Sequence, residues 1–308
     1  MYGALLMFSA GCSPLPRFAT GERPDRSQLV ESQPDIEQRN LFHGVGGPAL
    51  APPAQAPFRF VEKDTSGFND NYDLVDANGR AWDAKPGPEA QPEVVASRLL
   101  WAIGFHQPPV YYVKAWTMEG GPDAGAMPPA RFRLEQPGWK KKGTWDWQRN
   151  PFVGTRELDG LVVMMALLGN WDVKASNNQI YEVGEGRRIY VVKDLGSSLG
   201  RSVSRFLGTR GDLAGFESER LVREVRGERV VLDFDELMLS WGLDRGVSVD
   251  DVLWTCRRLD RLSDRQWRDA FRAAGYEGEV AERFVQHFRA KVREGLVLRQ
   301  AVTRRNGA

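Results

Sequence analysis

An apolar helix, a polar loop and a β-hairpin that follow one another constrain this fold more than any other feature. Thr155 is a suitable N-cap for a helix that runs to about Leu168 and is apolar on nearly all sides, so the helix should be central. The polar run Asn170-Trp-Asp-Val-Lys-Ala-Ser-Asn-Asn178 comes next. Two strand-like runs around Gly184-Glu-Gly186 then predict a hairpin, which ends at Asp194-Leu-Gly196.

The spacing of these elements brings polar side chains to one place. Paired strands lie about 4.8 Å apart, so the hairpin should return Asp194 to the end of the loop that carries Asn177. An amide oxygen and a carboxylate placed in this way can share one divalent cation. Asp172 lies at the start of the same loop, and Lys174 would neutralise negative charge beside it.

The N-terminal half contributes a lysine and an acid. Two strand-like runs surround Asn78-Gly79, a dipeptide typical of hairpin turns, and Lys85 ends the second run. A helix is predicted next, with Pro92 and Glu93 in its first turn, an apolar body from Val94 to Ile103, and Gly104 ending it. Phosphoryl transfer from a nucleotide needs a lysine for the phosphates, an acid that positions it, a residue that orients the attacking hydroxyl, and metal ligands.

These segments together resemble the protein-kinase-like superfamily. The catalytic and metal-binding loops are short, which makes them more similar to those of atypical members, such as the HipA-type and phosphatidylinositol-kinase-like groups. The residues that carry this resemblance are Ala81-Trp-Asp-Ala-Lys85 with Glu93, Asp172-Val-Lys-Ala-Ser-Asn177, and Asp194-Leu-Gly196.

Most of residues 39–275 also resemble an uncharacterised family of bacterial envelope-type proteins, which has no assigned substrate. The segments that carry this second resemblance are Arg39-Asn-Leu-Phe-His-Gly, Asn150-Pro-Phe-Val-Gly-Thr-Arg-Glu-Leu-Asp-Gly, Asn170-Trp-Asp-Val-Lys and Lys193-Asp-Leu-Gly.

The kinase resemblance implies a nucleotide site with ATP and Mg²⁺ or Mn²⁺ as cofactors. Lys85 would hold the phosphates and pair with Glu93, with Glu89 as the alternative partner. Gly67, in the segment Asp64-Thr-Ser-Gly-Phe-Asn69, would belong to the turn that covers the phosphates. The glycine-rich pattern Gly-x-Gly-x-x-Gly of typical kinases is not present in the sequence.

The same resemblance implies the catalytic and metal-binding residues. Asp172 would be the catalytic base, with Lys174 next to the transferred phosphoryl group. Asp194 would be the main metal ligand and Asn177 the second, with Asn178 as a substitute for Asn177.

A two-lobed α+β kinase-like fold is expected, with a small β-rich N-lobe and a larger, mainly helical C-lobe. The predicted boundaries are 1–57 for a signal- or lipobox-like segment and a proline-rich tether, 58–116 for the N-lobe, 117–130 for a Gly/Pro-rich inter-lobe connection, 131–300 for the C-lobe with the catalytic and metal-binding loops, and 301–308 for a tail.

The first residues resemble the lipobox of a bacterial lipoprotein. An apolar run from Tyr2 ends in small residues before Cys12, which would become the lipidated residue. The apolar run is short, and Ser9 stands where Leu is usual. From the resemblance we expect a cell-envelope protein that is anchored to the membrane through Cys12. Because of these two departures, a cytoplasmic protein is the alternative.

Composition limits the partners. The chain has 42 basic and 41 acidic side chains and a net charge of +1, which argues against a protein that coats nucleic acid, so no nucleic-acid partner is expected. Two cysteines and three scattered histidines do not suit a zinc cluster.

The sequence therefore favours an ATP- and metal-dependent phosphotransferase that acts on a hydroxyl group of an unknown protein, lipid or small molecule. One alternative is a kinase-fold envelope scaffold that no longer catalyses. Another is a metal-dependent phosphohydrolase that uses Asp172 and Asp194, although this would leave Lys85 and Glu93 unexplained.

Overall fold

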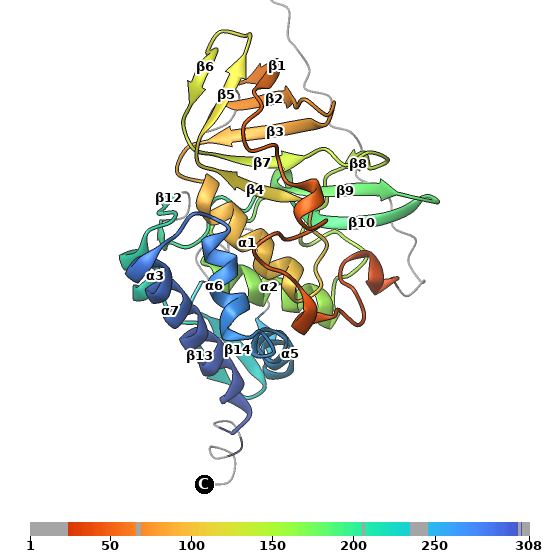
Figure 1. Cartoon of the computed structure of the whole chain (residues 1–308). Coiled ribbons are helices and arrows are strands. Elements are labelled where there is room, and N and C mark those ends of the chain that lie inside the picture. Colours follow the sequence, from red (N-terminus) through yellow and green to blue (C-terminus); the bar gives the residue numbers. More distant parts are fainter. Residues whose placement is uncertain (1–23, 66–68, 205–206, 235–245, 301–302, 304–308) are drawn as a thin grey trace, which may run out of the picture.

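The computed structural model describes residues 24–65, 69–204, 207–234, 246–300 and 303. A β-rich lobe lies above a larger, mainly helical lobe, and helix α1 (Ala90–Ala102) runs from the sheet down into the helical lobe (Figure 1). The predicted class, a two-lobed α+β fold, is confirmed.

The N-lobe is a seven-stranded sheet in the order β4-β7-β3-β2-β1-β5-β6. Its pairs are antiparallel except for β1 and β5, which run parallel. The strands are β1 (Phe58–Asp64), β2 (Asn71–Val75), β3 (Ala81–Pro86), β4 (Val110–Val113), β5 (Trp116–Glu119), β6 (Gly125–Met127) and β7 (Ala130–Leu134).

The turn expected at Asn78-Gly79 joins β2 to β3. Gly79 has a φ of +77°, which glycine adopts without steric cost. The Asp76 carboxylate accepts hydrogen bonds from the backbone N–H groups of Asn78 and Arg80 at 2.9 and 3.0 Å. This acid therefore fixes the turn, and with it the register that places Lys85 at the end of β3.

The two faces of this sheet differ because side chains alternate along a strand. One face carries a buried apolar cluster that includes Phe58, Trp82 and Phe132. The other face carries Asp83 and Lys85 of β3, which lie opposite Arg133 and Arg131 of β7. Contacts of the second set reach residues 193 and 194 of the C-lobe, so the charged face is the one that faces the helical lobe.

The C-lobe holds the predicted central helix as α2 (Arg156–Leu168). Thr155 caps it by accepting a hydrogen bond from the N–H of Leu158 at 3.3 Å, and Gly169 ends it in the left-handed region. The other helices are α3 (Leu213–Ser218), α5 (Val249–Asp260), α6 (Asp264–Arg272) and α7 (Gly278–Leu296).

Small sheets and short 3-10 helices complete the fold. The predicted hairpin is present as β9 and β10, with β8 as a third strand. These elements are β8 (Lys140–Gly143), β9 (Asn178–Val183), β10 (Arg187–Val192), β11 (Ser202–Ser204), β12 (Leu207–Gly208), β13 (Val222–Arg226), β14 (Arg229–Leu232), β15 (Val247–Ser248), η1 (Arg26–Gln28), η2 (Ile36–Gln38), η3 (Pro48–Leu50) and η4 (Ala175–Asn177).

Residues 117–130, expected to connect the lobes, belong instead to the sheet. They contribute most of β5, all of β6 and the first residue of β7, and β7 itself continues to Leu134. The glycines that suggested a linker serve a hairpin, because Gly120, Gly121 and Gly125 all have positive φ in and beside the β5–β6 turn. The N-lobe sheet therefore extends beyond residue 116, and the C-lobe begins later than residue 131.

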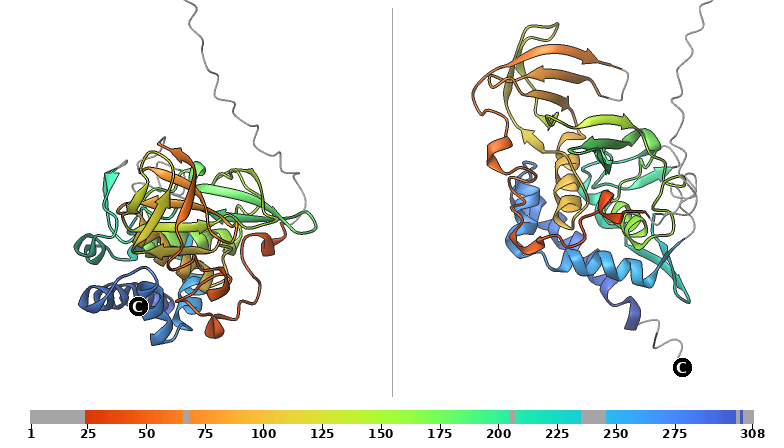
Figure 2. Two further views of the ribbon diagram at one scale, coloured as in Figure 1. Left: turned by 45° about the horizontal axis from the view of Figure 1, so that its top comes forward. Right: turned by 90° about the vertical axis from the view of Figure 1, so that its right-hand side faces the viewer.

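The predicted tether also differs from the structure in its second half. Leu29, Ile36 and Leu41 are fully buried in the main core, although the prolines around them restrict regular structure to short 3-10 helices. The Nε2 atom of Gln266 in α6 donates to the carbonyl oxygen of Ile36 at 2.7 Å. Figure 2 shows this segment, red to orange, running along the helical lobe.

Residues 1–23, which include Cys12, and most of the predicted tail at 301–308 lie outside the described residues. In the part of the chain that the structure describes, no helix combines the length and the apolar character needed to cross a bilayer.

Candidate functional site

Two segments that are distant in the sequence meet at Lys85. Its Nζ atom lies 2.7 Å from Oε2 of Glu89, which precedes α1, and 3.2 Å from Oδ2 of Asp194, which follows β10. The Lys85 side chain is only 13% exposed. The structure therefore brings the predicted lysine and the predicted main metal ligand into direct contact.

The predicted pairing of Lys85 with Glu93 is wrong, and the alternative partner, Glu89, takes its place. Helix α1 begins at Ala90, so that Pro92 and Glu93 lie in its first turn, as predicted. Glu89 therefore stands just ahead of the helix and next to the end of β3. Glu93, one turn further on, is buried and pairs with Arg131 Nε at 2.9 Å and with Arg133.

Glu89 is a junction between three parts of the molecule. Besides Lys85, it accepts a hydrogen bond from Nδ2 of Asn69 at 3.1 Å and pairs with Nη1 of Arg210 at 3.0 Å. Asn69 lies in the connection between β1 and β2. Arg210 also lies over the ring of Trp171, 5.3 Å from its centroid, and so links Glu89 to the polar loop after α2.

The polar loop is tied to Asp194 through the backbone. The carbonyl oxygen of Asn177 accepts hydrogen bonds from the N–H groups of Lys193 and Asp194 at 2.8 and 3.1 Å. The Asn177 side chain donates from Nδ2 to the carbonyl oxygen of Asp172 at 2.6 Å. Lys174 donates to Oδ2 of Asp172 at 2.8 Å. The Asp172 side chain is 24% exposed, so a substrate can still reach it.

Asn178, the predicted substitute for Asn177, does not join this cluster. Asn178 is the first residue of β9; its side chain is buried, and Nδ2 donates to the carbonyl oxygen of Trp145 at 3.0 Å. Asn178 is therefore held against Trp145 and is not part of the hydrogen-bonded loop of Asp172 and Asn177. Gly67 lies outside the described residues, and strands β1 and β2, which precede and follow it in the sequence, pair antiparallel.

The charges around Asp194 keep it ionised. Burial alone would raise its pKa, but Lys85, Arg133 and Arg131 outweigh that effect and lower the pKa to about 2. Burial would likewise lower the pKa of Lys85, yet Asp194, Glu93 and Glu89 raise it overall. The site therefore holds a carboxylate and an ammonium group in contact at neutral pH.

The donor set fits a magnesium ion that also binds phosphates. Asn177 uses its Nδ2 in a hydrogen bond, which turns Oδ1 into the atom available to a cation, and Asp194 supplies an ionised carboxylate. Mg²⁺ is usually held by one or two carboxylates together with substrate phosphates. Among the described residues there is no group of three or more His, Cys, Asp or Glu that could hold a metal without such a ligand.

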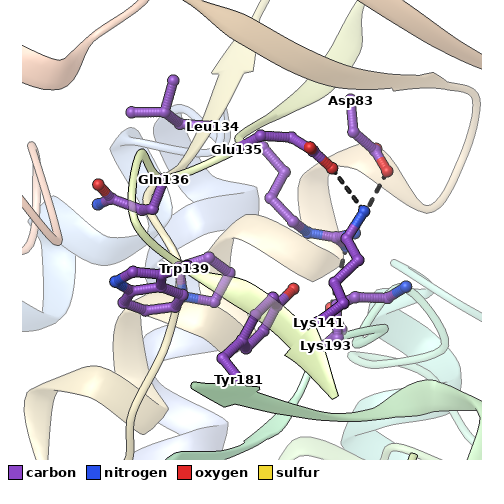
Figure 3. A pocket seen from close by; sticks show the side chains of 10 residues that line it. Asp83, Leu134, Glu135, Gln136, Trp139, Lys141, Tyr181 and Lys193 are labelled. Carbon is purple, nitrogen blue, oxygen red and sulfur yellow. Dashed lines mark hydrogen bonds and ion pairs between the residues drawn. The ribbon is translucent and has the colours of Figure 1, made fainter. Parts of the chain in front are cut away.

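A small cavity of about 50 Å³ lies beside this cluster, between the charged face of the sheet and strands β8 and β9 (Figure 3). Trp139 and Tyr181 stand together in it, with ring centroids 5.1 Å apart. Its lining residues are Asp83, Pro108, Arg133, Leu134, Glu135, Gln136, Trp139, Lys141, Tyr181 and Lys193.

Most of the residues that line this cavity were not predicted from the sequence. One signal was available: Asp83 and Lys85, like Arg131 and Arg133, are two residues apart and must share a face of their strands. The four charges form a set on that face, because Arg131 pairs with Asp83 and Arg133 lies 3.5 Å from it.

Comparison with known proteins gives remote similarities. No protein-family model matches the chain, and no curated protein matches it. The structure of CtkA, a proinflammatory kinase of Helicobacter pylori, is 14% identical with a TM-score of 0.40, over 78% of this chain and 93% of that one. The structure of the Golgi casein kinase is 11% identical with a TM-score of 0.33, over 79% of this chain and 75% of that one. The function of this chain is therefore inferred from the geometry of its own site.

Proposed function

We propose that this chain is a kinase-like phosphotransferase that uses ATP with Mg²⁺ or Mn²⁺ and acts on a hydroxyl group of a protein, lipid or small molecule. The observation that carries the proposal is the contact of the buried Lys85 ammonium group with both Glu89 and Asp194. Kinases need this set: a strand lysine for the phosphates, a helix-side acid that orients it, and an aspartate for the metal.

The surroundings of Lys85 support a nucleotide site. The β1–β2 connection reaches the lysine's partner, because Asn69 donates to Glu89. This connection contains Gly67, to which we assign the role of approaching the phosphates closely. The segment after Asp194 also packs closely against Glu89, since a Cβ on Gly196 would lie 2.6 Å from the Cβ of Glu89.

In this proposal, each residue of the polar loop has one task. Asp172 accepts the proton of the substrate hydroxyl, whose oxygen forms a bond to the terminal phosphorus of ATP while the bond to the ADP oxygen breaks. Lys174, now paired with Asp172, neutralises charge on the transferred group. Asn177 and Asp194 would hold the Mg²⁺, which neutralises phosphate charge when bound.

One observation favours a second candidate, a kinase-fold scaffold that binds a ligand without catalysis. The cleft face of the sheet next to Lys85 carries the ion-paired side chains of Asp83, Arg131 and Arg133. Ligand pockets are usually lined mainly by apolar groups, which suit a nucleobase better than these charges do. If these ion pairs occupy the place where a nucleobase would bind, the protein keeps the kinase-like fold but does not transfer phosphate.

The experiment that separates the two candidates measures binding and transfer in parallel. Thermal unfolding is followed with ATP and Mg²⁺ or Mn²⁺, because a ligand that binds the folded state raises the unfolding temperature. We expect stabilisation of the wild type, and its loss in Lys85→Met and Asp194→Asn. Lys142→Met, which removes an exposed lysine paired with Glu182, is the control and should retain it.

Phosphate incorporation from ATP labelled at the terminal phosphate is measured on the same proteins. Asp172→Asn should keep nucleotide binding and lower transfer by about 10²- to 10⁴-fold, the usual contribution of a general base. Binding without any transfer by the wild type would favour the scaffold. No stabilisation by nucleotide with either metal would exclude the phosphotransferase.

Location at the cell envelope through Cys12 remains part of the proposal. A full-length protein expressed in a bacterium should partition with membranes and carry a lipid on Cys12, detectable by its mass, and Cys12→Ser should become soluble. An unmodified Cys12 in a soluble wild-type protein would support the cytoplasmic alternative.

A further inference from the structure

A second concave site lies at the opposite end of α2 from the polar loop. It is a cavity of about 370 Å³ lined by Arg156, Asp250, Trp254, Arg257, Arg258 and Arg261. Arg156 is the first residue of α2, whereas Asp172 follows its last turn. A helix of 13 residues is about 20 Å long, so this arginine-lined cavity is separate from the proposed active site.

The floor of the cavity is fixed by close packing of α2 against α5. A Cβ on Gly160 would lie 2.4 Å from the Trp254 ring, so only a glycine lets the indole approach α2 this closely. The Thr255 hydroxyl donates to the carbonyl oxygen of Gly160 at 3.2 Å and holds the two helices together. Trp254 is therefore a rigid aromatic surface.

Arg258 is held in place above this floor. Its guanidinium lies 4.1 Å from the centroid of the Trp254 ring, and Nη1 donates to the carbonyl oxygen of Ile103 at 2.7 Å. These contacts fix the planar group without neutralising its charge. A pre-organised guanidinium loses little conformational freedom when it binds an anion.

The cavity has more positive charge than its own acid can neutralise. It holds four arginines and one carboxylate, Asp250, which pairs with Arg299 at 2.5 Å. Arg261 pairs with Glu37 at 2.7 Å. Arg156 and Arg257 are exposed, and in the described part of the chain no carboxylate forms an ion pair with either of them.

We propose that this cavity binds a phosphomonoester carried by a peptide, as on a phosphorylated serine, threonine or tyrosine. Guanidinium groups match phosphate oxygens with two parallel hydrogen bonds, and clusters of arginine are a recurring means of recognising phosphorylated segments. The volume exceeds what a lone phosphate needs, and the exposed part of the Trp254 ring offers apolar contact to the flanking chain.

The rim of the cavity argues against a polyanion. Asp250 lines the cavity, Glu37 pairs with Arg261, and the charge of Glu157 acts on Arg258. A nucleic acid or an anionic membrane presents a row of negative charges and needs a continuous basic path, which these acids interrupt. A single phosphate that enters the centre avoids them.

The test uses the full chain without nucleotide or metal, so its outcome is independent of phosphoryl transfer. The probe is a fluorescently labelled alanine–glycine peptide with one central phosphoserine, and binding is measured by anisotropy. The unphosphorylated peptide, O-phosphoserine, inorganic phosphate and single-stranded oligo-dT are competitors. We expect the phosphopeptide to bind, and the R156A/R257A protein to bind it about tenfold or more weakly.

Two variants make the result specific. R257K keeps the charge and loses the planar fork, so it should weaken binding less than R257A does. R265A removes a highly exposed arginine of the neighbouring helix α6 and should leave binding unchanged. Thermal unfolding temperatures of all variants should match the wild type, because the replaced side chains are exposed.

Three outcomes would overturn the proposal. The first is equal binding of the phosphorylated and unphosphorylated peptides. The second is unchanged phosphopeptide affinity in R156A/R257A. The third is tighter binding of oligo-dT or inorganic phosphate than of the phosphopeptide, which would assign the cavity to a polyanion or to a free anion.

Discussion

The two faces of the seven-stranded sheet are made by the same strands and stabilise the molecule in different ways. Trp82 and Asp83 are neighbours in β3, yet Trp82 packs among aromatic rings while Asp83 contacts arginines. The apolar face gains free energy in proportion to the area it buries, whatever the partner. The charged face gains only when each ion finds its own partner, because an unpaired buried charge is costly.

This difference indicates which face carries function. A ligand with phosphates and a cation can replace the partners of Lys85 and Asp194 without disturbing the rings on the other side of the strands. The apolar face holds β3 in place, and the charged face offers groups that can exchange partners. Substitutions on the two faces should therefore separate stability from ligand binding.

The largest effect on stability is expected on the apolar face. Trp82 is 1% exposed, and Trp82→Ala should lower the free energy of unfolding by about 3–5 kcal/mol, through lost burial and the cavity left behind. Urea denaturation measures this loss. The folded fraction should still be stabilised by ATP and metal. A loss below about 1 kcal/mol would mean that the aromatic cluster does not hold the sheet.

A somewhat smaller loss is expected from the buried acid of the charged face. Glu93→Ala should cost about 3 kcal/mol, because it leaves Arg131 and Arg133 buried with Asp83 as their remaining partner. The control is Glu135→Ala, whose pair with Lys141 is half exposed and should contribute less than about 1 kcal/mol. Equal losses in the two variants would show that the buried network adds nothing beyond a surface pair.

A moderate effect on stability is expected where the backbone of Gly196 packs against the Glu89 side chain. Gly196→Ala places a Cβ 2.6 Å from the Cβ of Glu89 and should cost about 1–3 kcal/mol, as overpacking does. It should also weaken stabilisation by ATP, because Glu89 and Lys85 must move away from Asp194. Gly184→Ala, at a site that also lacks a positive φ and has open space around it, is the matched control for the contact. If both variants bind nucleotide equally weakly, the contact with Glu89 is irrelevant.

Local patterns predicted the parts of the site that lie close together in the chain. The hairpin of β9 and β10 returns Asp194 to Asn177 because a short turn fixes the register of its strands, so this approach follows from the sequence. The cap at Thr155 and the turn at Gly79 were predictable for the same reason, since each depends on contacts within a few residues.

Non-local pairing could not be predicted. Strand β3 lies next to β7, which follows it by about fifty residues, and nothing in either strand specifies the other as its neighbour. Arg131 and Arg133 were therefore assigned to the wrong lobe. The exchange of Glu93 for Glu89 follows from the same non-local pairing, because Arg131 and Arg133 of β7 pair with Glu93 and Lys85 pairs with Glu89.

The smallest expected effect is the pH dependence of the stability that the Lys85–Asp194 pair contributes. It also gives the most direct comparison of the charged and apolar faces of the sheet. The folded-state pKa of Asp194 is about 2, below the value of about 3.9 in an unfolded chain. The unfolded state therefore binds more protons between these values. The contribution of the Lys85–Asp194 pair is present in full above about pH 4 and is lost as the pH falls through about 2.

We expect this contribution to be about 1–2 kcal/mol, because Asp194 is partly exposed to solvent. It is measured as the difference in unfolding free energy between the wild type and Asp194→Asn, which should shrink as the pH falls from 5 to 2. Neither Trp82 nor the alanine that replaces it has a titratable side chain, so the stability lost in Trp82→Ala should not change over the same pH range. Glu282→Gln removes a surface pair with Arg268 and should show a smaller difference. If the Asp194 difference stays constant with pH, the carboxylate contributes by packing, and the charged face would then stabilise the sheet in the same way as the apolar one.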